Sequence, residues 1–455
     1  MQFLRPLFRG MRSLSRNTTQ PARIYRPLFE SLEDRMVPSA VLLVDDDHAQ
    51  APNAQYTSIS AAVAAAQPGD TIRVYSGTYH ESVTVPKTLT FQAVAKAGPV
   101  VVDPGALGSG FNIQANDVRI LGFTVQDAIG NPGINLSRTV SGADIEHNVL
   151  QDNTFGVYLN SNGTDRTVIR DNRFLHNNAA GAASGNGIYS DQGVTNARIV
   201  DNFFTGQQNA AMIFVGNGTA TQAQSDLTIR GNTLDHDAPI ILVNASNSTI
   251  SDNLSIASAG SGIFFGGGVH DVVVSHNTLR DGAFTGINLR MDSANYPVST
   301  PDTKNVIRDN VITGFGDSGI RLRDGASGNL VANNRISGNG TGGDPSTGDG
   351  ISLEAAAGNV IRDNHVTDNR RDGIRIDAAS TDNRIINNHL RHNGEHDAHD
   401  DSTGTSTAGT ANTWRGNKGK TENRPGLLAD HGDDHDHDDD HDDRGRRDHG
   451  GDRDD

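Results

Sequence analysis

Charged side chains recur at fixed positions of a short phrase that repeats through the second half of the sequence. The phrase reads Gly-Ile-x-Leu, and arginine and carboxylate residues occupy the x position and the position two residues further on. A planar guanidinium group can hold a carboxylate bidentately, and a carboxylate can act as a base or bind Ca²⁺. These residue types predict binding of a polymer that carries carboxylates, with removal of an α-proton as further chemistry. The candidates are Asn288, Arg290, Arg321, Arg323, Glu354, Arg375 and Asp377, and Asp292 lies close to them in sequence.

The same positions hold aromatic and apolar residues in the first half of the chain. Tyr158, Tyr189 and Phe264 occupy the x position, and Asp191 follows Tyr189 by two residues. Aromatic rings beside a polar group suit stacking on sugar rings. A second interpretation is equally supported, in which duplication of the repeat places like residues above one another and arginine pairs with aspartate at little energetic gain.

These positions belong to a longer repeat that is marked by asparagine. Each asparagine follows Ile or Val by three residues, and an apolar residue comes two positions after it in all but one case. The intervals range from 21 to 33 residues, and every apolar run is short with a period of two. Three short strands per repeat, without crossover helices, predict a parallel β-helix whose strands pair with those of the next coil. The asparagines are Asn148, Asn172, Asn202, Asn232, Asn253, Asn277, Asn310, Asn334, Asn364 and Asn388.

Stacking also suggests a role for these asparagines. A sharp corner between strands needs a left-handed conformation, which asparagine tolerates, and we expect each asparagine to take it. Its side-chain amide can then bond to the asparagine one coil above. Five residues further on, Asn153, Asn177, Asn339, Asn369 and Asn393 suggest a partial second ladder.

Differences in repeat length indicate where function should lie. Extra residues occur at 178–186, 216–226, 291–304 and 340–349, always beside the Gly-Ile strand. We expect these insertions to form the walls of a groove whose floor is the outward face of that strand.

Both ends of the stack need caps, because a solenoid exposes unpaired strand edges. The Ala-rich segment Thr57–Gln67 is the one convincing helix, with Ile59, Val63 and Ala66 expected to face the core. At the other end, Trp414 should close the last coil. The acidic stretch 396–401 is expected to belong to this C-terminal cap.

Composition narrows the classes of function. The chain has 455 residues, a net charge of −17 and no cysteine, which excludes disulfides, thiolate metal ligands and a thiol nucleophile. An acidic body argues against a nucleic-acid partner, and no apolar run is long enough for a transmembrane segment. We divide the chain into a leader at 1–40, a β-helix at 41–428 and a disordered tail at 429–455.

The two ends carry different signals. Leu32-Glu33-Asp34-Arg35 resembles the short LEPR-XLL type export motif, which implies a secreted or cell-surface protein. The tail alternates histidine and aspartate, which predicts a solvated acidic segment, with collection of divalent cations as the alternative.

The segments Tyr56–Asp70 and Thr71–Glu81 resemble the opening of pectin-lyase-like right-handed parallel β-helix proteins. The repeats are similar to NosD-type and related right-handed β-helix regions, and Asn412–Asn417 is similar to their closing phrase. This resemblance implies an all-β right-handed solenoid of about a dozen coils over roughly residues 41–428. It implies no single activity, and no catalytic motif of the related enzymes is evident here.

Three functions therefore compete at this stage. The first is a secreted β-helix that binds carbohydrate, the second a polysaccharide lyase, epimerase or hydrolase, and the third a NosD-type metal-handling accessory protein. The expected partner is a polysaccharide, no cofactor is certain, and Ca²⁺ is the cation that the acidic candidates would suit. The oligomeric state is left open.

Overall fold

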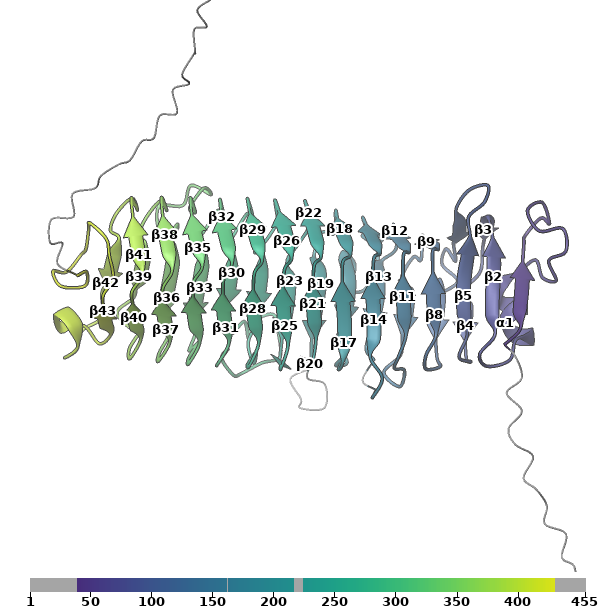
Figure 1. Ribbon diagram of the computed structural model, residues 1–455, viewed down its shortest axis with the longest axis horizontal. Helices are drawn as coiled ribbons and strands as arrows, with labels where there is room; N and C mark the ends of the chain where they lie inside the picture. The colour runs from purple at the N-terminus through teal and green to yellow at the C-terminus, as the bar shows by residue number, and fades with distance from the viewer. Residues whose placement is uncertain (1–38, 162, 217–223, 430–455) are drawn as a thin grey trace, which may run out of the picture. The chain divides into compact units, whose positions relative to one another are not determined.

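The computed structural model describes residues 39–161, 163–216 and 224–429. The Leu32–Arg35 motif and the His/Asp tail from residue 430 lie outside these ranges. Three long sheets account for nearly all of the described secondary structure, and each coil of the chain contributes one strand to each sheet in turn (Figure 1). Every strand pair in these sheets is parallel and joins equivalent strands of successive coils. The architecture is a parallel β-helix, as the repeat predicts.

Sheet 1 has 15 strands, stacked in the order β1 (Val41–Val44), β2 (Thr71–Tyr75), β5 (Thr90–Val94), β8 (Arg119–Leu121), β11 (Asp144–Glu146), β14 (Thr167–Arg170), β17 (Ala197–Val200), β21 (Thr228–Arg230), β25 (Thr249–Ser251), β28 (Val273–Ser275), β31 (Val306–Arg308), β34 (Leu330–Ala332), β37 (Val360–Arg362), β40 (Arg384–Ile386) and β43 (Thr413–Arg415).

Sheet 2 has 13 strands, in the order β3 (Gly77–Tyr79), β6 (Val100–Val102), β9 (Thr124–Gln126), β12 (Val149–Gln151), β15 (Arg173–Leu175), β18 (Phe203–Thr205), β22 (Thr233–Asp235), β26 (Leu254–Ile256), β29 (Thr278–Arg280), β32 (Val311–Thr313), β35 (Arg335–Ser337), β38 (His365–Thr367) and β41 (His389–Arg391).

Sheet 3 contains the Gly-Ile strands and also has 13 members, in the order β4 (Val83–Val85), β7 (Phe111–Ile113), β10 (Pro132–Leu136), β13 (Phe155–Leu159), β16 (Asn186–Ser190), β19 (Ala210–Val215), β23 (Ile240–Val243), β27 (Ile263–Phe265), β30 (Ile287–Leu289), β33 (Ile320–Arg323), β36 (Ile351–Glu354), β39 (Ile374–Ile376) and β42 (Ala398–Asp400). A small two-stranded sheet pairs β20 (Gln224–Ser225) with β24 (Ala245–Ser246).

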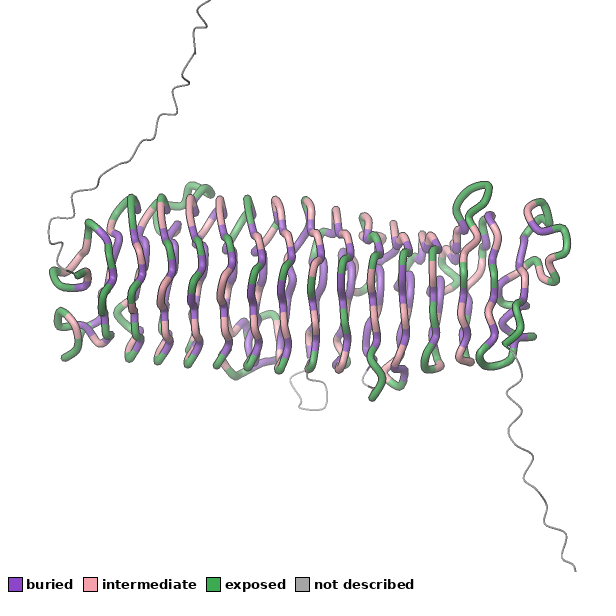
Figure 2. Tube along the Cα trace, viewed as in Figure 1, coloured by how far each residue is buried: buried purple, intermediate pink, exposed green. Residues whose placement is uncertain are grey.

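The core is a column of apolar side chains between the three sheets. Buried and exposed residues alternate along each coil (Figure 2), because successive side chains of a strand point to opposite faces. Ile145, Ile169 and Ile199 lie in register on neighbouring strands, and each is fully buried. The rings of Phe174 and Phe204 stack with centroids 4.5 Å apart. The thin, stacked core therefore needs few large residues.

The asparagine ladder is confirmed, but its backbone geometry differs from the expectation. Asn148 donates its side-chain amide to Asn172 Oδ1 at 3.0 Å, and the series runs on to a bond between Asn388 and Asn417 at 2.9 Å. The left-handed residue is the one before the asparagine, such as His147 at φ 56°. The prediction that asparagine itself takes this conformation is wrong. The preceding residue makes the turn, and the buried asparagine bonds to backbone and to the next coil.

Two further ladders run beside the first. The predicted second ladder is confirmed by a bond of 3.0 Å between Asn153 and Asn177 and one of 2.8 Å between Asn339 and Asn369. A third ladder, which we did not predict, joins Asn305, Asn329, Asn359, Asn383 and Asn412.

Both predicted caps are present. Helix α1 (Ile59–Ala65) is shorter than the predicted Thr57–Gln67 and contacts β1, β2 and β4, with Ile59, Val63 and Ala66 buried. Trp414 lies on the last strand of sheet 1, and its Nε1 donates to Asp400 Oδ2 at 2.8 Å. A short 3-10 helix, η2 (Thr407–Gly409), precedes this strand.

Candidate functional site

The outward face of sheet 3 carries most of the predicted site residues. Tyr158 and Tyr189 pair on β13 and β16, and Asn288 and Arg321 pair on β30 and β33. Phe264 lies on β27 and Arg375 on β39, while Arg323 and Glu354 end β33 and β36. Asp191, Arg290 and Asp377 follow the ends of β16, β30 and β39. The structure separates these residues into an aromatic group and a charged group.

The aromatic group is held together by Asp191. Its carboxylate accepts hydrogen bonds from Tyr158 Oη at 2.5 Å and from Tyr189 Oη at 3.2 Å. Burial and the neighbouring carboxylate raise the pKa of Tyr158 to about 12 and also raise that of Tyr189, so both phenols stay protonated. The two rings stack on each other, with centroids 5.8 Å apart and an interplanar angle of 14°. Their facing surfaces are therefore occupied, and this group presents ring edges and hydroxyls.

The next stretch of the floor is covered by the chain itself. Tyr296 and Val298, from insertion 291–304, pack on the outward face of β19, β23 and β27. Ile213, Ile241 and Val243 are buried there. The prediction that this insertion is a wall is wrong, because its apolar residues lie over the floor rather than beside it. The ring centroids of Phe264 and Tyr296 lie 6.3 Å apart, and Phe264 is half-buried.

The charged group begins with Arg321 and Arg323 on β33. Arg321 is clamped by Glu354 at 2.6 Å and by Asp317 at 2.7 Å, and its side chain is 19% exposed. Arg323 lies 3.4 Å from Asp324 and 3.8 Å from the same Glu354. Arg290 is more loosely placed, 3.9 Å from Asp292 and 4.0 Å from Asp324. The predicted arginine ladder exists, but each of these arginines already has a carboxylate neighbour.

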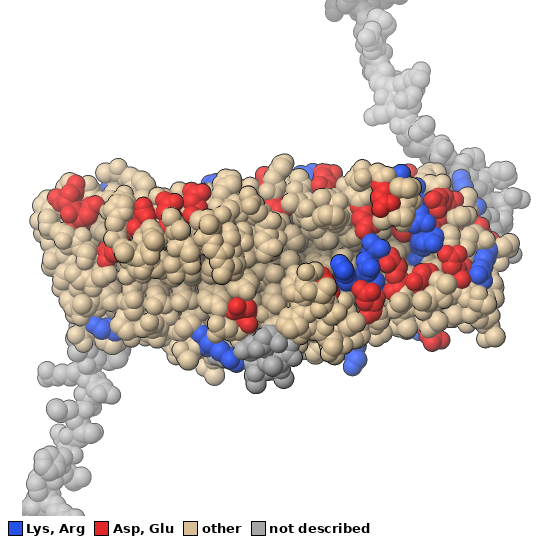
Figure 3. Space-filling view, turned by 180° about the vertical axis from the view of Figure 1, so that it is seen from behind, with Lys and Arg blue, Asp and Glu red and all other residues tan. Residues whose placement is uncertain are grey.

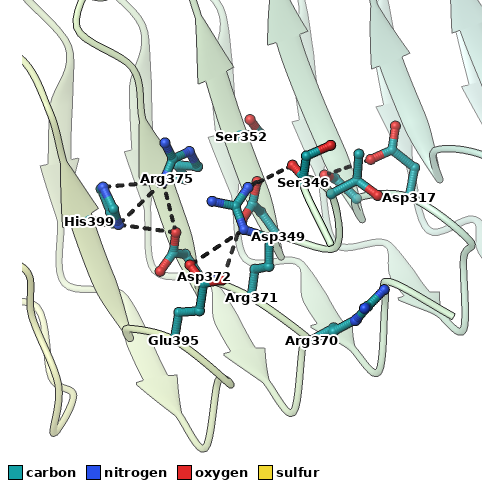
Figure 4. A network of polar contacts seen from close by, with 12 residues as sticks. Asp317, Ser346, Asp349, Ser352, Arg370, Arg371, Asp372, Arg375, Glu395 and His399 are labelled. Atoms are coloured by element: carbon teal, nitrogen blue, oxygen red, sulfur yellow. Dashed lines mark hydrogen bonds and ion pairs between the residues drawn. The ribbon is translucent and has the colours of Figure 1, made fainter. Parts of the chain in front are cut away.

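Arg375 is the centre of a second network, which Figure 4 shows from close by. Its guanidinium contacts Asp372 at 3.2 Å and Asp401 at 3.0 Å, and one of its nitrogens lies 3.1 Å from His399 Nε2. Asp372 is buried below it and also lies 3.1 Å from His399 Nδ1. Asp377 does not join this network, because its carboxylate accepts bonds from the Ala355 amide and the Ser380 hydroxyl and so fixes a turn.

Insertion 340–349 lies beside the charged group. Arg371 donates to the Ser346 carbonyl at 2.7 Å, and Arg370 donates to the Asp344 carbonyl at 3.1 Å. These two arginines of the next coil hold the insertion in place, as Figure 4 shows for Ser346. The other insertions are less informative, since 216–226 is described only in part and 178–186 lies beside the aromatic group.

The pKa values of two buried carboxyls on neighbouring coils are shifted in opposite directions. Burial raises the pKa of Asp349 to about 7. Burial also opposes ionisation of Asp372, but the hydrogen bond and charge of His399, together with Arg375, outweigh it and lower the pKa of Asp372. The Asp372 amide donates to Asp349 Oδ1 at 3.2 Å, so the two groups are direct neighbours. Opposite shifts of this kind favour an acid and a base role for the two carboxyls.

Sequence reasoning missed the contribution of β42. The prediction that the stretch 396–401 belongs to the C-terminal cap is wrong, because His399 lies on the last strand of sheet 3 and pairs with Arg375. Asp401 follows the end of that strand. The spacing contained a signal, because Ala398 follows Ile374 by 24 residues, the commonest interval of the repeat.

Figure 3 shows the side of the molecule opposite to that of Figure 1. Acidic and basic side chains gather toward its C-terminal end, and uncharged residues cover most of the remainder of this view. We use the name ion-pair surface for the charged residues on the outward face of sheet 3, which are Arg290, Arg321, Arg323, Glu354, Arg375, His399 and Asp401. Its cations and carboxylates are interleaved, so it has no large area of one sign.

Comparison with known proteins supports the fold. A family model described as right handed beta helix region matches residues 298–421, and a model described as periplasmic copper-binding protein (NosD) matches residues 208–344. No curated protein matches the chain. The solenoid is a right-handed parallel β-helix, as expected from the resemblance.

Several solved structures are similar in fold. The tailspike protein of E. coli bacteriophage HK620, solved in complex with a pentasaccharide, is 14% identical with a TM-score of 0.53, and the match covers 72% of this chain and 71% of that one. The Dettilon tailspike protein is 17% identical with a TM-score of 0.50, over 73% and 62% of the two chains. A mannuronic acid specific polysaccharide lyase from human gut microbiota is 13% identical with a TM-score of 0.49, over 84% and 83%. For the two tailspike proteins, the likeness at these identities establishes the fold alone.

One matching family is described as copper-binding, so we asked whether the matched residues of this chain could hold a copper ion. Within the described part of residues 208–344, no three His, Asp or Glu side chains are placed to share one ion. The rings of His236 and His270 each pair with the adjacent aspartate. The matched span therefore does not fit a copper site. None of the helices among the described residues is long and apolar enough to cross a membrane.

Proposed function

We propose that this protein binds carbohydrate on the outward face of sheet 3, with the ion-pair surface as the principal contact. The observation that carries the proposal is the placement of Arg321 and Arg375 at the same register on β33 and β39, with Glu354 on the intervening strand β36, two residues further along. Each is partly exposed and is held by an ion pair or hydrogen bond at 2.6–3.0 Å. Successive strands are about 4.8 Å apart, so the two guanidinium groups project from strands about 9.6 Å apart, and the Glu354 carboxylate comes from the strand between them.

Pre-organised polar side chains are well suited to sugar hydroxyls. A hydroxyl both donates and accepts, so an interleaved row of guanidinium groups and carboxylates can satisfy both roles. Hydrogen bonds to charged groups contribute about 1.5–3 kcal/mol each. The ion pairs already fix the side-chain rotamers, which reduces the entropy lost on binding.

The ion pairs of Arg321 and Arg375 also indicate which class of carbohydrate this surface favours. A polymer of uronic acids would bring carboxylates to Arg321 and Arg375, where Asp317, Glu354, Asp372 and Asp401 already occupy the guanidinium groups. Additional carboxylates would meet repulsion from these aspartates and glutamate. The geometry therefore supports a hydroxyl-rich neutral glycan over the acidic polysaccharide that the sequence suggests.

The fold comparisons are consistent with carbohydrate binding. The HK620 tailspike, which is similar in fold, is known from a complex with a pentasaccharide. The export motif at Leu32–Arg35 lies outside the described residues. We include in the proposal that this protein is located outside the cytoplasm.

A second candidate is chemical modification of the bound carbohydrate. It is favoured by the neighbouring carboxyls Asp349 and Asp372 with their opposite pKa shifts. Both side chains are nearly inaccessible, at 4% and 0% exposure, so a sugar would reach them only after Arg371 or Arg375 moves. Release of reducing ends or unsaturated products by the wild type, and its loss in Asp349→Asn, would support catalysis.

The direct experiment is a binding screen of the full chain against immobilised neutral and uronic polysaccharides. We expect retention on at least one neutral glycan, and weaker binding by Arg375→Ala. The matched control is Arg335→Ala, an exposed arginine on β35 in sheet 2, which should bind as the wild type does. Retention on none of the polysaccharides, or equal loss in both variants, would contradict the proposal.

A further inference from the structure

At the C-terminal end of sheet 3, an aspartate of one coil faces two histidines of the next coil. Asp372 precedes β39, and His396 and His399 lie before and on β42. Asp372 Oδ1 lies 3.2 Å from His396 Nδ1, and Asp372 Oδ2 lies 3.1 Å from His399 Nδ1. One ligand atom from each of the three residues lies within 4.8 Å of the others. We propose that Asp372, His396 and His399 bind a divalent transition metal ion, with Zn²⁺ as the representative case.

The distances suit such an ion. Zinc bonds to imidazole nitrogen and carboxylate oxygen at about 2.0–2.2 Å in tetrahedral geometry, which places neighbouring ligand atoms about 3.3 Å apart. Each histidine nitrogen lies close to this separation from a different oxygen of Asp372, and one ligand atom from each residue lies within 4.8 Å of the others. Two imidazoles and one carboxylate also leave a further coordination position for water or a ligand.

The surroundings hold the ligands in place. The Asp372 side chain is fully buried, and the His396 backbone amide donates to its Oδ1 at 3.0 Å. His399 Nδ1 faces Asp372 while its Nε2 lies 2.9 Å from Asp401 Oδ1. A carboxylate on the far nitrogen of a ligating histidine is the usual outer contact of zinc sites, where it fixes the ring and its tautomer.

Arg375 is the group that an incoming ion would have to displace. Its Nη1 lies 3.2 Å from Asp372 Oδ2, and its Nη2 lies 3.0 Å from Asp401 Oδ2. The guanidinium can keep its contact with Asp401 when it releases Asp372, so the arginine need not lose every partner. Arg375→Ala should therefore strengthen metal binding, whereas the same change weakens carbohydrate binding in the account above.

The chain offers a matched control for the two histidines. His365 and His389 stack with ring centroids 5.0 Å apart on β38 and β41 of sheet 2. His365 and His389 come from neighbouring coils, whereas His396 and His399 belong to one coil, and no acidic residue joins His365 and His389 in a three-residue cluster among the described residues. A double alanine variant at either pair removes two histidines and leaves those of the tail unchanged.

The test is calorimetric titration of Zn²⁺ into the full-length wild type, H396A/H399A and H365A/H389A, with circular dichroism melting curves for each. We expect one site in the wild type and in H365A/H389A that H396A/H399A binds at least about a hundredfold more weakly. Asp401→Asn should weaken it about tenfold. Any binding by the tail is common to all variants, because none of the substitutions lies in it.

Equal binding by H396A/H399A and the wild type would overturn the proposal, as would equal losses in the two double variants. If H396A/H399A melts well below the wild type, the single variant H396A replaces it, because His396 is 34% exposed and has little core contact. Co²⁺ absorption gives a readout that is independent of stability, since coordination by imidazole and carboxylate produces visible bands that H396A must alter. Unaltered bands would equally overturn the proposal.

Discussion

Arg321 and Glu354 lie on neighbouring strands of sheet 3 and are joined by a contact of 2.6 Å between Nε and Oε1. The same carboxylate also lies 3.8 Å from Arg323. Glu354 thus neutralises the part of the surface where two arginines of one strand project together. Together with Asp317 and Asp324, Glu354 keeps the arginines from acting as a free cationic ladder.

Replacing Glu354 with glutamine should convert this surface into a binder of acidic polymers. The change removes one negative charge between two arginines and keeps the shape of the side chain, so polyuronate affinity should rise several-fold at low salt and return to the wild-type level at about 0.5 M salt. Asp165→Asn, an exposed carboxylate between β13 and β14, is the control. Strong polyuronate binding already present in the wild type, with no gain in Glu354→Gln, would show that the arginines are free to bind carboxylates.

Within each corner of the ladder, the buried asparagine should stabilise the folded protein, whereas the side chain of the left-handed residue before it should contribute little. Asn334 is buried, donates to Asn364 Oδ1 at 2.9 Å and accepts from Asn310. Its replacement with alanine leaves several buried polar groups unpaired and should lower the free energy of unfolding by about 3 kcal/mol or more. Asn333→Gly, at φ 56°, should change it by less than about 1 kcal/mol. Denaturant unfolding of both variants measures this, and similar losses would contradict the division of roles.

Asp237 should make the protein less stable as the pH rises. Burial raises the pKa of its carboxyl from 3.8 to about 7. Because the folded-state pKa lies above the unfolded one, the group costs nothing below about pH 4, and the free energy of unfolding falls as the pH rises toward 7. Asp237→Asn should therefore stabilise the protein at pH 8 by on the order of 1–3 kcal/mol and have little effect at pH 4.

The half-exposed neighbour Asp235 provides the control for this titration. Thermal or denaturant unfolding of Asp235→Asn should follow the wild-type pH profile. An Asp237→Asn profile parallel to the wild type between pH 4 and 8 would show that the buried carboxyl does not titrate in this range.

Tyr296 should stabilise the cover over the middle of sheet 3. Its ring packs on Phe264 and on the buried residues beneath the 291–304 segment, so Tyr296→Ala should cost about 2 kcal/mol and expose an apolar patch that binds a hydrophobic dye. Phe284→Ala, at a residue that is 59% exposed, should change stability by less than about 0.5 kcal/mol. Unchanged dye binding in Tyr296→Ala would mean that the segment does not cover the strands.

The repeat made the fold predictable because period-two strands and a fixed asparagine spacing allow few other ways to satisfy the backbone. The side toward which Tyr158, Arg321 and Arg375 point also follows from that period. The residues that contact these side chains could not be predicted from the period-two pattern. Asp317 and Asp401 reach the arginines from outside the repeated phrase, and Tyr296 covers the floor from an insertion whose path no periodicity describes. Insertion length indicates that a segment is present near the strand, but not whether it stands beside the strand or lies on it.

The most direct test of the account is calorimetric titration of a retained neutral oligosaccharide into the wild type, R321A/R323A and Arg335→Ala. R321A/R323A should keep its melting temperature within a few degrees but lose at least about tenfold in affinity, because two charged hydrogen-bond donors are removed. Arg335→Ala, on sheet 2, should bind as tightly as the wild type. Undiminished affinity in R321A/R323A would contradict the claim that carbohydrate binds at the ion-pair surface.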